Sequence, residues 1–144
     1  MKVSVFFGYK SDTNQGKMMI GYITVGTNDL PRAVTFFDSL LAEVGATRFM
    51  QEETFVAWAV EPDQPGISVC KPWDGNAASV GNGSMIALTV DSNDKVDAVY
   101  AKAMELGGSD EGPPGIRMEG FYAAYFRDLD GNKMNVFCMQ MADV

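Results

Sequence analysis

The chain has 144 residues, with 11 lysines and arginines, 19 aspartates and glutamates and no histidine, so its formal charge at pH 7 is −8. This length predicts one domain with enough chain to bury a core. The missing histidines exclude serine–histidine and cysteine–histidine nucleophile pairs, imidazole bases and zinc sites that need imidazole. Acid–base chemistry would have to come from carboxylates, tyrosine, lysine or cysteine.

The acidic balance limits the expected partners and location. A strongly negative chain repels the phosphates of nucleic acids and of anionic membranes, so neither is expected as a partner. No uninterrupted apolar stretch reaches the roughly 18 residues that a membrane helix needs. Cys70 and Cys138 lie in apolar, strand-like segments and are expected to be buried reduced thiols, which is typical of a cytoplasmic protein.

Residues 1–17 differ in pattern from the rest of the chain. Residues 3–7 are apolar enough for a short strand, whereas residues 10–17 are polar and typical of a loop. Three alternatives stay open for this extension: an extra edge strand, a poorly ordered segment, or residues upstream of a translation start at Met18 or Met19.

The first half of the remaining chain, residues 18–73, predicts a strand, a helix and three strands. Residues 20–25 are apolar and β-branched, which indicates a strand. A helix-start signal around Asp29 precedes residues 30–44, whose apolar side chains recur at helical spacing. Strand patterns follow at residues 47–52, 55–60 and 67–71.

The second half repeats this order. Residues 74–83 are rich in glycine and asparagine and lack the lysine and threonine of a phosphate-binding loop, so we interpret them as a linker. In residues 84–140 a strand pattern at residues 85–90 precedes a capped helix pattern that ends near residue 106. Strand patterns follow at residues 116–118, 121–127 and 133–139. We therefore predict one domain at 18–140, in which two modules pair and curve their sheets around a cavity.

Several segments carry a family resemblance. The sequence reads MIGYITVG at residues 19–26, NDL at 28–30, FFD at 36–38, GNGS at 81–84 and FRDLDGNK at 126–133. These segments resemble the first strand–helix unit, the start of the second module and the final hairpin of the vicinal oxygen chelate superfamily, which holds glyoxalase I, bleomycin-resistance proteins and extradiol dioxygenases. The resemblance implies an α+β fold of paired βαβββ modules that form a curved, U-shaped mixed sheet around one cavity.

The acidic run in the final hairpin raises the alternative of a calcium-binding loop. An EF-hand loop would carry its glycine two residues later and end in a glutamate, and neither holds at Asp128, Asp130 and Gly131. We interpret the run as a turn between strands.

In catalytic members of the superfamily, histidine and glutamate side chains on the inner face bind a divalent metal. The resemblance places Tyr22, Met85 and Asn135 at three of these positions. Tyrosine and methionine bind hard divalent metals poorly, and asparagine offers only a neutral oxygen. We therefore expect no metal and no other cofactor.

Strand alternation predicts which side chains face the cavity. It turns Tyr22 and Thr24, Met85 and Ala87, and Asn135 and Phe137 inward, while their neighbours face the helices. Which members of a further aromatic group face inward stays open: Phe55, Trp58, Tyr122, Tyr125 and Phe126. The predicted ligand-binding residues are Tyr22, Thr24, Trp58, Met85, Ala87, Tyr125, Asn135 and Phe137.

These features favour a protein that binds a small molecule, cationic or aromatic, in the sheet cavity without a metal. The alternative is a glyoxalase- or lyase-type enzyme that uses Glu119, Tyr22 or another carboxylate as its base, or that binds a metal through an unplaced site. Glu119 is the candidate catalytic carboxylate because it lies in the glycine- and proline-rich residues 112–120, which are expected to form a loop over the cavity mouth. A non-catalytic partner or regulatory module is a third possibility. The resemblance also implies a homodimer.

Overall fold

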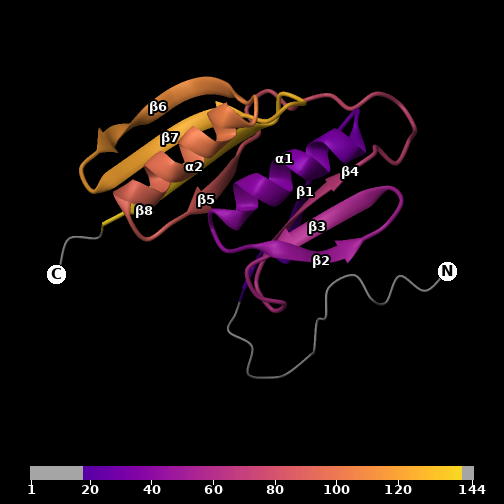
Figure 1. The fold of residues 1–144 in the computed structure, drawn as a ribbon, viewed down its shortest axis with the longest axis horizontal. Helices are drawn as coiled ribbons and strands as arrows, with labels where there is room; N and C mark the ends of the chain where they lie inside the picture. The colour runs from indigo at the N-terminus through magenta and orange to yellow at the C-terminus, as the bar shows by residue number, and fades with distance from the viewer. Residues whose placement is uncertain (1–17, 141–144) are drawn as a thin grey trace.

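The computed structural model describes residues 18–140, in which two modules follow one another along the chain (Figure 1). The alternatives for residues 1–17 concern a segment outside the described residues. The first module comprises β1 (Tyr22–Gly26), α1 (Leu30–Ala42), β2 (Thr47–Gln51), β3 (Phe55–Ala59) and β4 (Gly66–Cys70). The second comprises β5 (Ile86–Thr89), α2 (Asn93–Glu105), β6 (Ser109–Met118), β7 (Phe121–Arg127) and β8 (Lys133–Met139).

Each module contains a mixed sheet of four strands. The strand orders are β1-β4-β3-β2 and β5-β8-β7-β6. The first strand of each module pairs in parallel with the last, and the other pairs are antiparallel. The α+β fold of two βαβββ modules is therefore confirmed. Within residues 18–140 the curved sheet consists of two open halves, whose edge strands β1 and β5 share no ladder.

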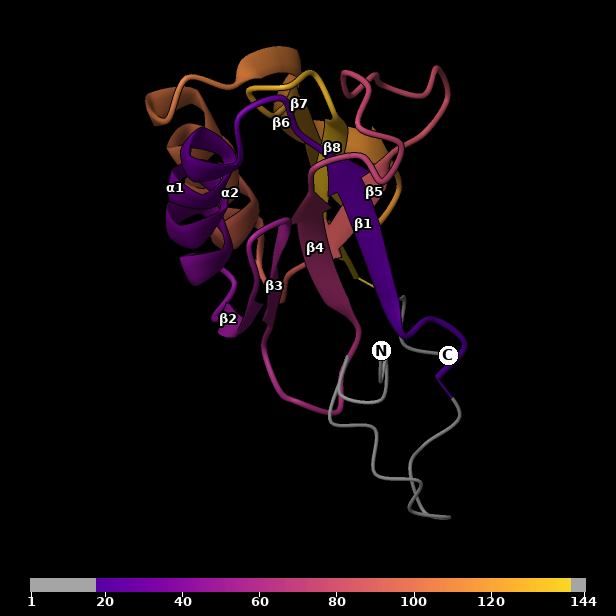
Figure 2. The same ribbon diagram turned by 90° about the vertical axis from the view of Figure 1, so that its right-hand side faces the viewer.

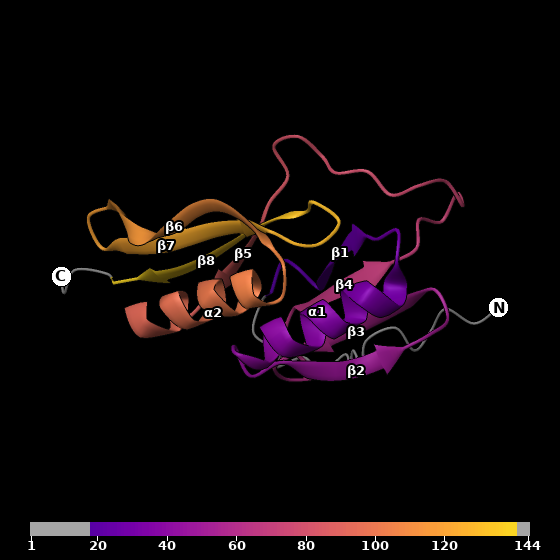
Figure 3. The same ribbon diagram turned by 45° about the horizontal axis from the view of Figure 1, so that its top comes forward.

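Both helices cover the same side of the two sheets, and α1 contacts α2 (Figure 2). Figure 3 shows the modules side by side, with each helix lying along its own sheet. The opposite side of the sheets, called the open face below, carries neither helix. Neither α1 nor α2 is long and apolar enough to cross a membrane.

The helices begin and end where the sequence predicts local signals. The side chain of Asp29 accepts a hydrogen bond from the backbone N–H of Arg32, and the side chain of Ser92 accepts one from Lys95. These caps satisfy backbone donors that have no partner inside a helix. Gly45 follows α1 with φ of +81°, a conformation that glycine adopts without strain.

The core lies between each helix and its sheet. From α1 it takes Leu30, Ala33, Phe36, Phe37, Leu40 and Leu41, which pack with Val56, Trp58 and Val69 of the first sheet. From α2 it takes Val96, Val99 and Ala103, which pack with Ala124, Phe126, Met134, Val136 and Cys138 of the second sheet. Cys138 is buried, whereas Cys70 is only half-buried, and both are free thiols.

Trp58 requires a correction, because it belongs to this core and not to the cavity. Its side chain is 1 % exposed, and its ring lies 5.8 Å from that of Phe37 on α1. Its indole N–H donates a hydrogen bond of 2.8 Å to Asp38, also on α1. Alternation along β3 could not show this, because Val56, Ala57, Trp58 and Ala59 are all buried.

The glycine- and proline-rich residues 112–120 also differ from their prediction as a loop. Most of them belong to β6, which is ten residues long and pairs with β7 through several register shifts. β6 is an edge strand, where a proline without an N–H costs no ladder bond on the outer side. The bulges absorb the irregular backbone around Pro113 and Pro114.

The turn between β7 and β8 joins the second module to the first. Asp130 accepts hydrogen bonds from the Thr27 hydroxyl at 2.6 Å and from the Asn28 backbone N–H at 2.9 Å. Arg32 approaches the same carboxylate at 3.2 Å. The Asn132 amide donates to the carbonyl of Gly26 at 3.0 Å. This turn therefore binds the connection between β1 and α1.

Asp128 shapes the turn from within. Its carboxylate accepts hydrogen bonds from the backbone N–H groups of Asp130 and Asn132 and from the Asn132 side chain. Burial raises the pKa of Asp128, and the hydrogen bonds from Asn132 and Asp130 oppose that rise. The acidic run therefore forms a hydrogen-bonded turn, as the sequence predicts.

We predict that Asp130→Ala destabilises the domain by about 2 kcal/mol, because the buried Thr27 hydroxyl and the Asn28 N–H lose their acceptor. The Asp130 side chain is 4 % exposed, so water replaces it poorly. Urea denaturation measures the loss. Asp91→Ala removes an exposed ion pair with Lys95 and serves as the control, with a change below about 0.5 kcal/mol. Equal effects of the two substitutions would contradict a special role for Asp130.

A second prediction concerns pH. The guanidinium of Arg48 beside Asp38 holds the pKa of this carboxyl below its ordinary 3.8; burial opposes this, and Trp58 adds a hydrogen bond. A lowered pKa means that the ionised form stabilises the fold above pH 3.8 and that this contribution is lost as the pH falls further. Asp38→Asn keeps an acceptor for Trp58 but loses the charge. Its stability deficit at pH 7 should shrink below pH 3.8.

Unfolding by urea over a pH series tests this expectation. Asp63→Asn changes an exposed carboxylate in the loop before β4 and provides the matched control. A deficit for Asp38→Asn that stays constant down to pH 3 would rule out the coupling to Arg48.

Candidate functional site

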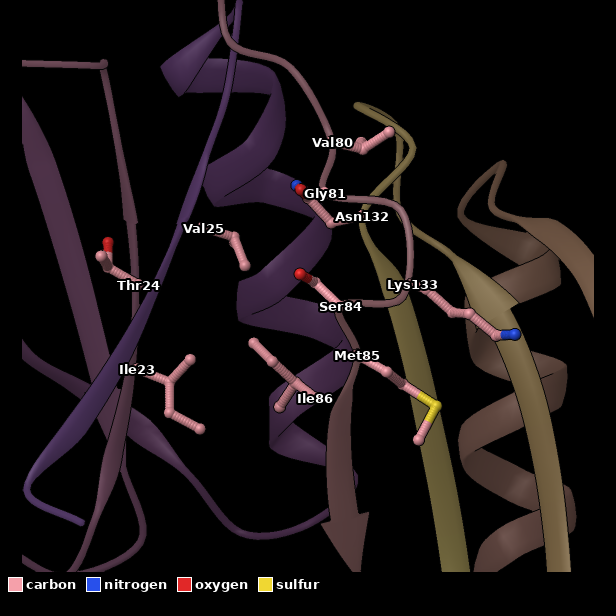
Figure 4. Close-up of a pocket in the computed structure, with 10 residues that line it drawn as sticks. All are labelled: Ile23, Thr24, Val25, Val80, Gly81, Ser84, Met85, Ile86, Asn132 and Lys133. Atoms are coloured by element: carbon pink, nitrogen blue, oxygen red, sulfur yellow. The ribbon is translucent and has the colours of Figure 1, made fainter.

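A groove lies between the edge strands β1 and β5, with a volume of about 230 Å³ (Figure 4). It is lined by residues of β1, of the segment that leads into β5 and the start of β5, and of the turn that leads into β8 and the start of β8: Ile23, Thr24, Val25, Val80, Gly81, Ser84, Met85, Ile86, Asn132 and Lys133. The groove exists because β1 and β5 share no ladder, so the space between them is left to side chains. A site of this kind, mostly apolar with a few polar groups, suits a small organic molecule.

The side chains around the groove point in two directions. Figure 4 shows Ile23, Val25 and Ile86 directed into the gap, in front of α1. Met85 and Lys133 turn together to the side away from β1. The groove therefore has an apolar floor and meets the open face of the second sheet along its β5 side.

On the first sheet, the predicted residues Tyr22 and Thr24 lie on β1. Thr24 is exposed, lines the groove and donates a hydrogen bond of 3.4 Å to the hydroxyl of Ser68 on β4. Tyr22 is 49 % exposed. Phe55 on β3 pairs with Cys70 on β4. Because it is three residues from Trp58 along β3, its side chain points to the other face of the sheet, which is the open face.

On the second sheet, three predicted residues form a row across the strands. Ala87 pairs with Asn135, and Asn135 pairs with Tyr125. Residues directly opposite one another in adjacent strands share a face. Ala87 is exposed, and Tyr125 is half-buried. Phe137 lies one step further along and stacks on Phe121, with ring centroids 5.3 Å apart.

Asn135 is the buried member of this row. It is 2 % exposed, and its Nδ2 atom donates to the carbonyl oxygens of Ala124 at 3.0 Å and Val136 at 3.3 Å. The amide therefore holds two strand carbonyls. A carboxylate oxygen in the same place would face these carbonyl oxygens and would lose both bonds.

The other aromatic candidates face the helices. Phe126 is fully buried in the core, and the Tyr122 hydroxyl donates a hydrogen bond of 2.6 Å to Asp97 on α2. This bond to a carboxylate raises the pKa of Tyr122, and burial raises it further. Tyr122 and Phe126 therefore belong to the interface between α2 and its sheet.

Glu119 does not lie over the groove. It sits in the turn between β6 and β7, where Gly120 has φ of +74°, and it is exposed and absent from the residues that line the groove. The structure therefore brings no carboxylate from this turn to the site.

Sequence reasoning missed two residues near the row, Arg117 on β6 and Lys133 on β8. The Arg117 guanidinium carbon and the Lys133 Nζ atom each lie 5.6 Å from the centroid of the Tyr125 ring. Lys133 is the last residue of the FRDLDGNK segment, which carries the family resemblance, so the sequence did draw attention to its position. Nothing in the sequence singles out Arg117, because its position depends on the bulged path of β6.

The donor set does not fit the metal centre of catalytic superfamily members. Within residues 18–140 no group of three or more histidine, cysteine, aspartate and glutamate side chains could hold a metal ion. The three positions expected to hold ligands carry Tyr22, Met85 and Asn135, and Asn135 already binds two carbonyls. These side chains bind hard divalent metals poorly.

Comparisons with known proteins agree with the fold. The family model of the Glyoxalase/Bleomycin resistance protein/Dioxygenase superfamily matches residues 19–136. The chain is similar to the crystal structure of a glyoxalase/bleomycin resistance protein from Albidiferax ferrireducens T118, with 31 % identity, a TM-score of 0.79 and coverage of 85 % of this chain and 100 % of that one. No curated protein matches the chain.

More distant structures share the fold alone. The fosfomycin resistance protein FosX from Listeria monocytogenes has 17 % identity and a TM-score of 0.66, with coverage of 88 % of this chain and 97 % of that one. Lactoylglutathione lyase from Agrobacterium tumefaciens has 17 % identity and a TM-score of 0.64, with coverage of 86 % and 96 %. By its fold and by the family model that spans most of its length, the chain belongs to the Glyoxalase/Bleomycin resistance protein/Dioxygenase superfamily.

Proposed function

We propose that this protein binds a small organic molecule in the groove and on the adjoining open face, without a metal ion. The observation that carries the proposal is the chemistry at the three expected ligand positions. There Tyr22 on β1 and Met85 directly before β5 offer exposed contact surface, and Asn135 donates its amide N–H groups to backbone carbonyls. The site keeps the means to contact a ligand while it lacks donors suited to a metal.

The shape of the site supports binding by contact. The apolar floor of the groove, made by Ile23, Val25 and Ile86, can cover one side of a flat apolar group. Met85 is flexible and polarisable, so it adapts to ligands of different outline. The Tyr125 ring presents a face for stacking further along the same sheet. Together these groups suit an aromatic or largely apolar molecule.

The two distant structures are named for different activities: one is a resistance protein and the other is a lyase. Fold alone therefore does not select a reaction. The enzyme alternative needs a base near the groove. Of its two named candidates, Glu119 is in the β6–β7 turn and Tyr22 is an exposed side chain on β1 that is not among the residues lining the groove. The groove therefore supports binding better than turnover.

The homodimer and the cytoplasmic location, both expected from the sequence, stay predictions. Light scattering after gel filtration measures the first, and fractionation of cells measures the second.

We predict that metal removal leaves ligand binding unchanged. Calorimetry with 2-naphthoate, 2-naphthol and 2-naphthylmethylamine, three probes of one ring system, is performed on protein dialysed against EDTA. At least one probe should bind with a 1:1 ratio, and Zn²⁺ or Mn²⁺ should not alter its affinity. Stoichiometric metal binding together with probe binding that requires the metal would overturn the proposal.

A further prediction places the ligand on the row that contains Ala87. Ala87→Trp puts a bulky ring on the exposed side of β5 and should weaken binding of the same probe at least about tenfold, because steric overlap removes stacking contacts. Ala101→Trp adds the same ring to the exposed surface of α2 and should leave the affinity unchanged. Calorimetry gives both affinities, and equal affinities would place the ligand elsewhere.

A further inference from the structure

We propose that the open face around Tyr125 binds an oxyanion, a carboxylate, sulfonate or phosphate, attached to the apolar small molecule. Arg117 and Lys133 would supply the positive charge. This inference rests on the proposed function and deepens it by assigning the charge of the ligand. It replaces the cationic ligand that the overall charge of −8 suggested.

The pairing of charges singles out these two residues. Residues 18–140 contain eight lysines and arginines, of which five form ion pairs. The remaining three are Lys71, Arg117 and Lys133. In an acidic protein, carboxylates for further pairs are abundant, yet two of these three cations share one aromatic ring.

The geometry brings the two cations close enough to act on one anion. Each lies 5.6 Å from the centroid of the Tyr125 ring, so the two are no further apart than twice that distance. Like charges that lie within a Debye length of each other, about 8 Å at physiological salt, repel. An oxyanion beside the ring would relieve this repulsion and accept charge-assisted hydrogen bonds from either side.

Two glycines make room for Arg117. A Cβ atom at Gly115 would lie 2.9 Å from Nη1 of Arg117, and one at Gly112 would lie 3.2 Å from Nη2. The guanidinium therefore rests against backbone that carries no side chains. Its Nη2 atom donates a hydrogen bond of 2.5 Å to the carbonyl of Pro113. Contact with this carbonyl and with the Tyr125 ring orients the guanidinium before any ligand arrives, which lowers the entropy cost of binding.

The remaining charges on β6, β7 and β8 leave the open face positive. Asp110 accepts a hydrogen bond from the Tyr100 hydroxyl of α2, on the helix side. Glu111 pairs with Arg127 at 2.6 Å, so these two charges cancel. Lys133 also lies close enough to Glu111 to help lower the pKa of that carboxyl, after the larger effect of Arg127. Arg117 and Lys133 are the two cations of these strands that form no ion pair. Because Lys133 also lines the groove, the positive region continues into the apolar site.

Calorimetry with the three naphthalene probes tests the inference. The anion 2-naphthoate should bind at least about tenfold more tightly than neutral 2-naphthol or cationic 2-naphthylmethylamine. Arg117→Gln and Lys133→Gln should each weaken 2-naphthoate binding about tenfold or more, and leave 2-naphthol binding unchanged. Lys71→Gln removes the third unpaired cation and should have no effect, which controls for overall charge.

The outcomes separate the two proposals. Equal or tighter binding of 2-naphthol or 2-naphthylmethylamine would overturn the oxyanion site and leave the metal-free binding protein standing. An equal loss of 2-naphthoate affinity in Lys71→Gln would also overturn the site, because the effect would then be general. Failure of all three probes to bind at millimolar concentration would overturn both proposals. Thermal unfolding monitors the variants, and Lys133→Gln on β8 keeps the test valid if Arg117→Gln does not fold.

Discussion

The contact of the Asp130 carboxylate with the first module is the constraint on which the site depends. The edge strands β1 and β5 share no ladder, so the hydrogen-bonded sheets do not fix the relative position of the two modules. Helix packing supplies one contact, and the bonds from Thr27 and Asn28 to Asp130 supply another at the end of the groove. Lys133 follows this turn directly, so the anchor also fixes where its charge enters the groove.

Most of the fold could be predicted from local patterns. The predicted strands at residues 121–127 and 133–139 have the bounds of β7 and β8, because their alternation and the turn between them are both encoded locally. The helix-start signal predicted around Asp29 is also confirmed, because Asp29 is the N-cap residue of α1. The path of β6 could not be predicted in the same way. Its glycines and prolines indicate a loop, and only its place at the edge of a sheet allows them in a strand.

The candidate site was less predictable, because the face of a side chain depends on tertiary contacts. Thr24 and Met85, which alternation turned inward, line the groove, but so do Ile23 and Val25, which it turned toward the helices. Alternation could not place Trp58, whose strand is buried on both faces and whose indole finds its partner Asp38 on a helix. The two cations beside Tyr125 were missed because they lie on different strands, and only the pairing of β6, β7 and β8 brings them to one ring.

The difference between overall and local charge bears on how such a site would select a ligand. A net charge of −8 acts at long range and slows the approach of an anion, and salt screens this effect over about 8 Å. Arg117 and Lys133 act at contact distance, where their hydrogen bonds govern how long a bound oxyanion stays. The net charge lowers the association rate of an anion, whereas the two cations favour an anion once it is bound. The net charge therefore does not change which ligand the site prefers at contact. An anion that lacks an apolar part would gain the contact charge without the groove, whereas a neutral apolar molecule would gain the groove alone. A site with both the two cations and the apolar groove therefore prefers a molecule that has both an anionic group and an apolar part.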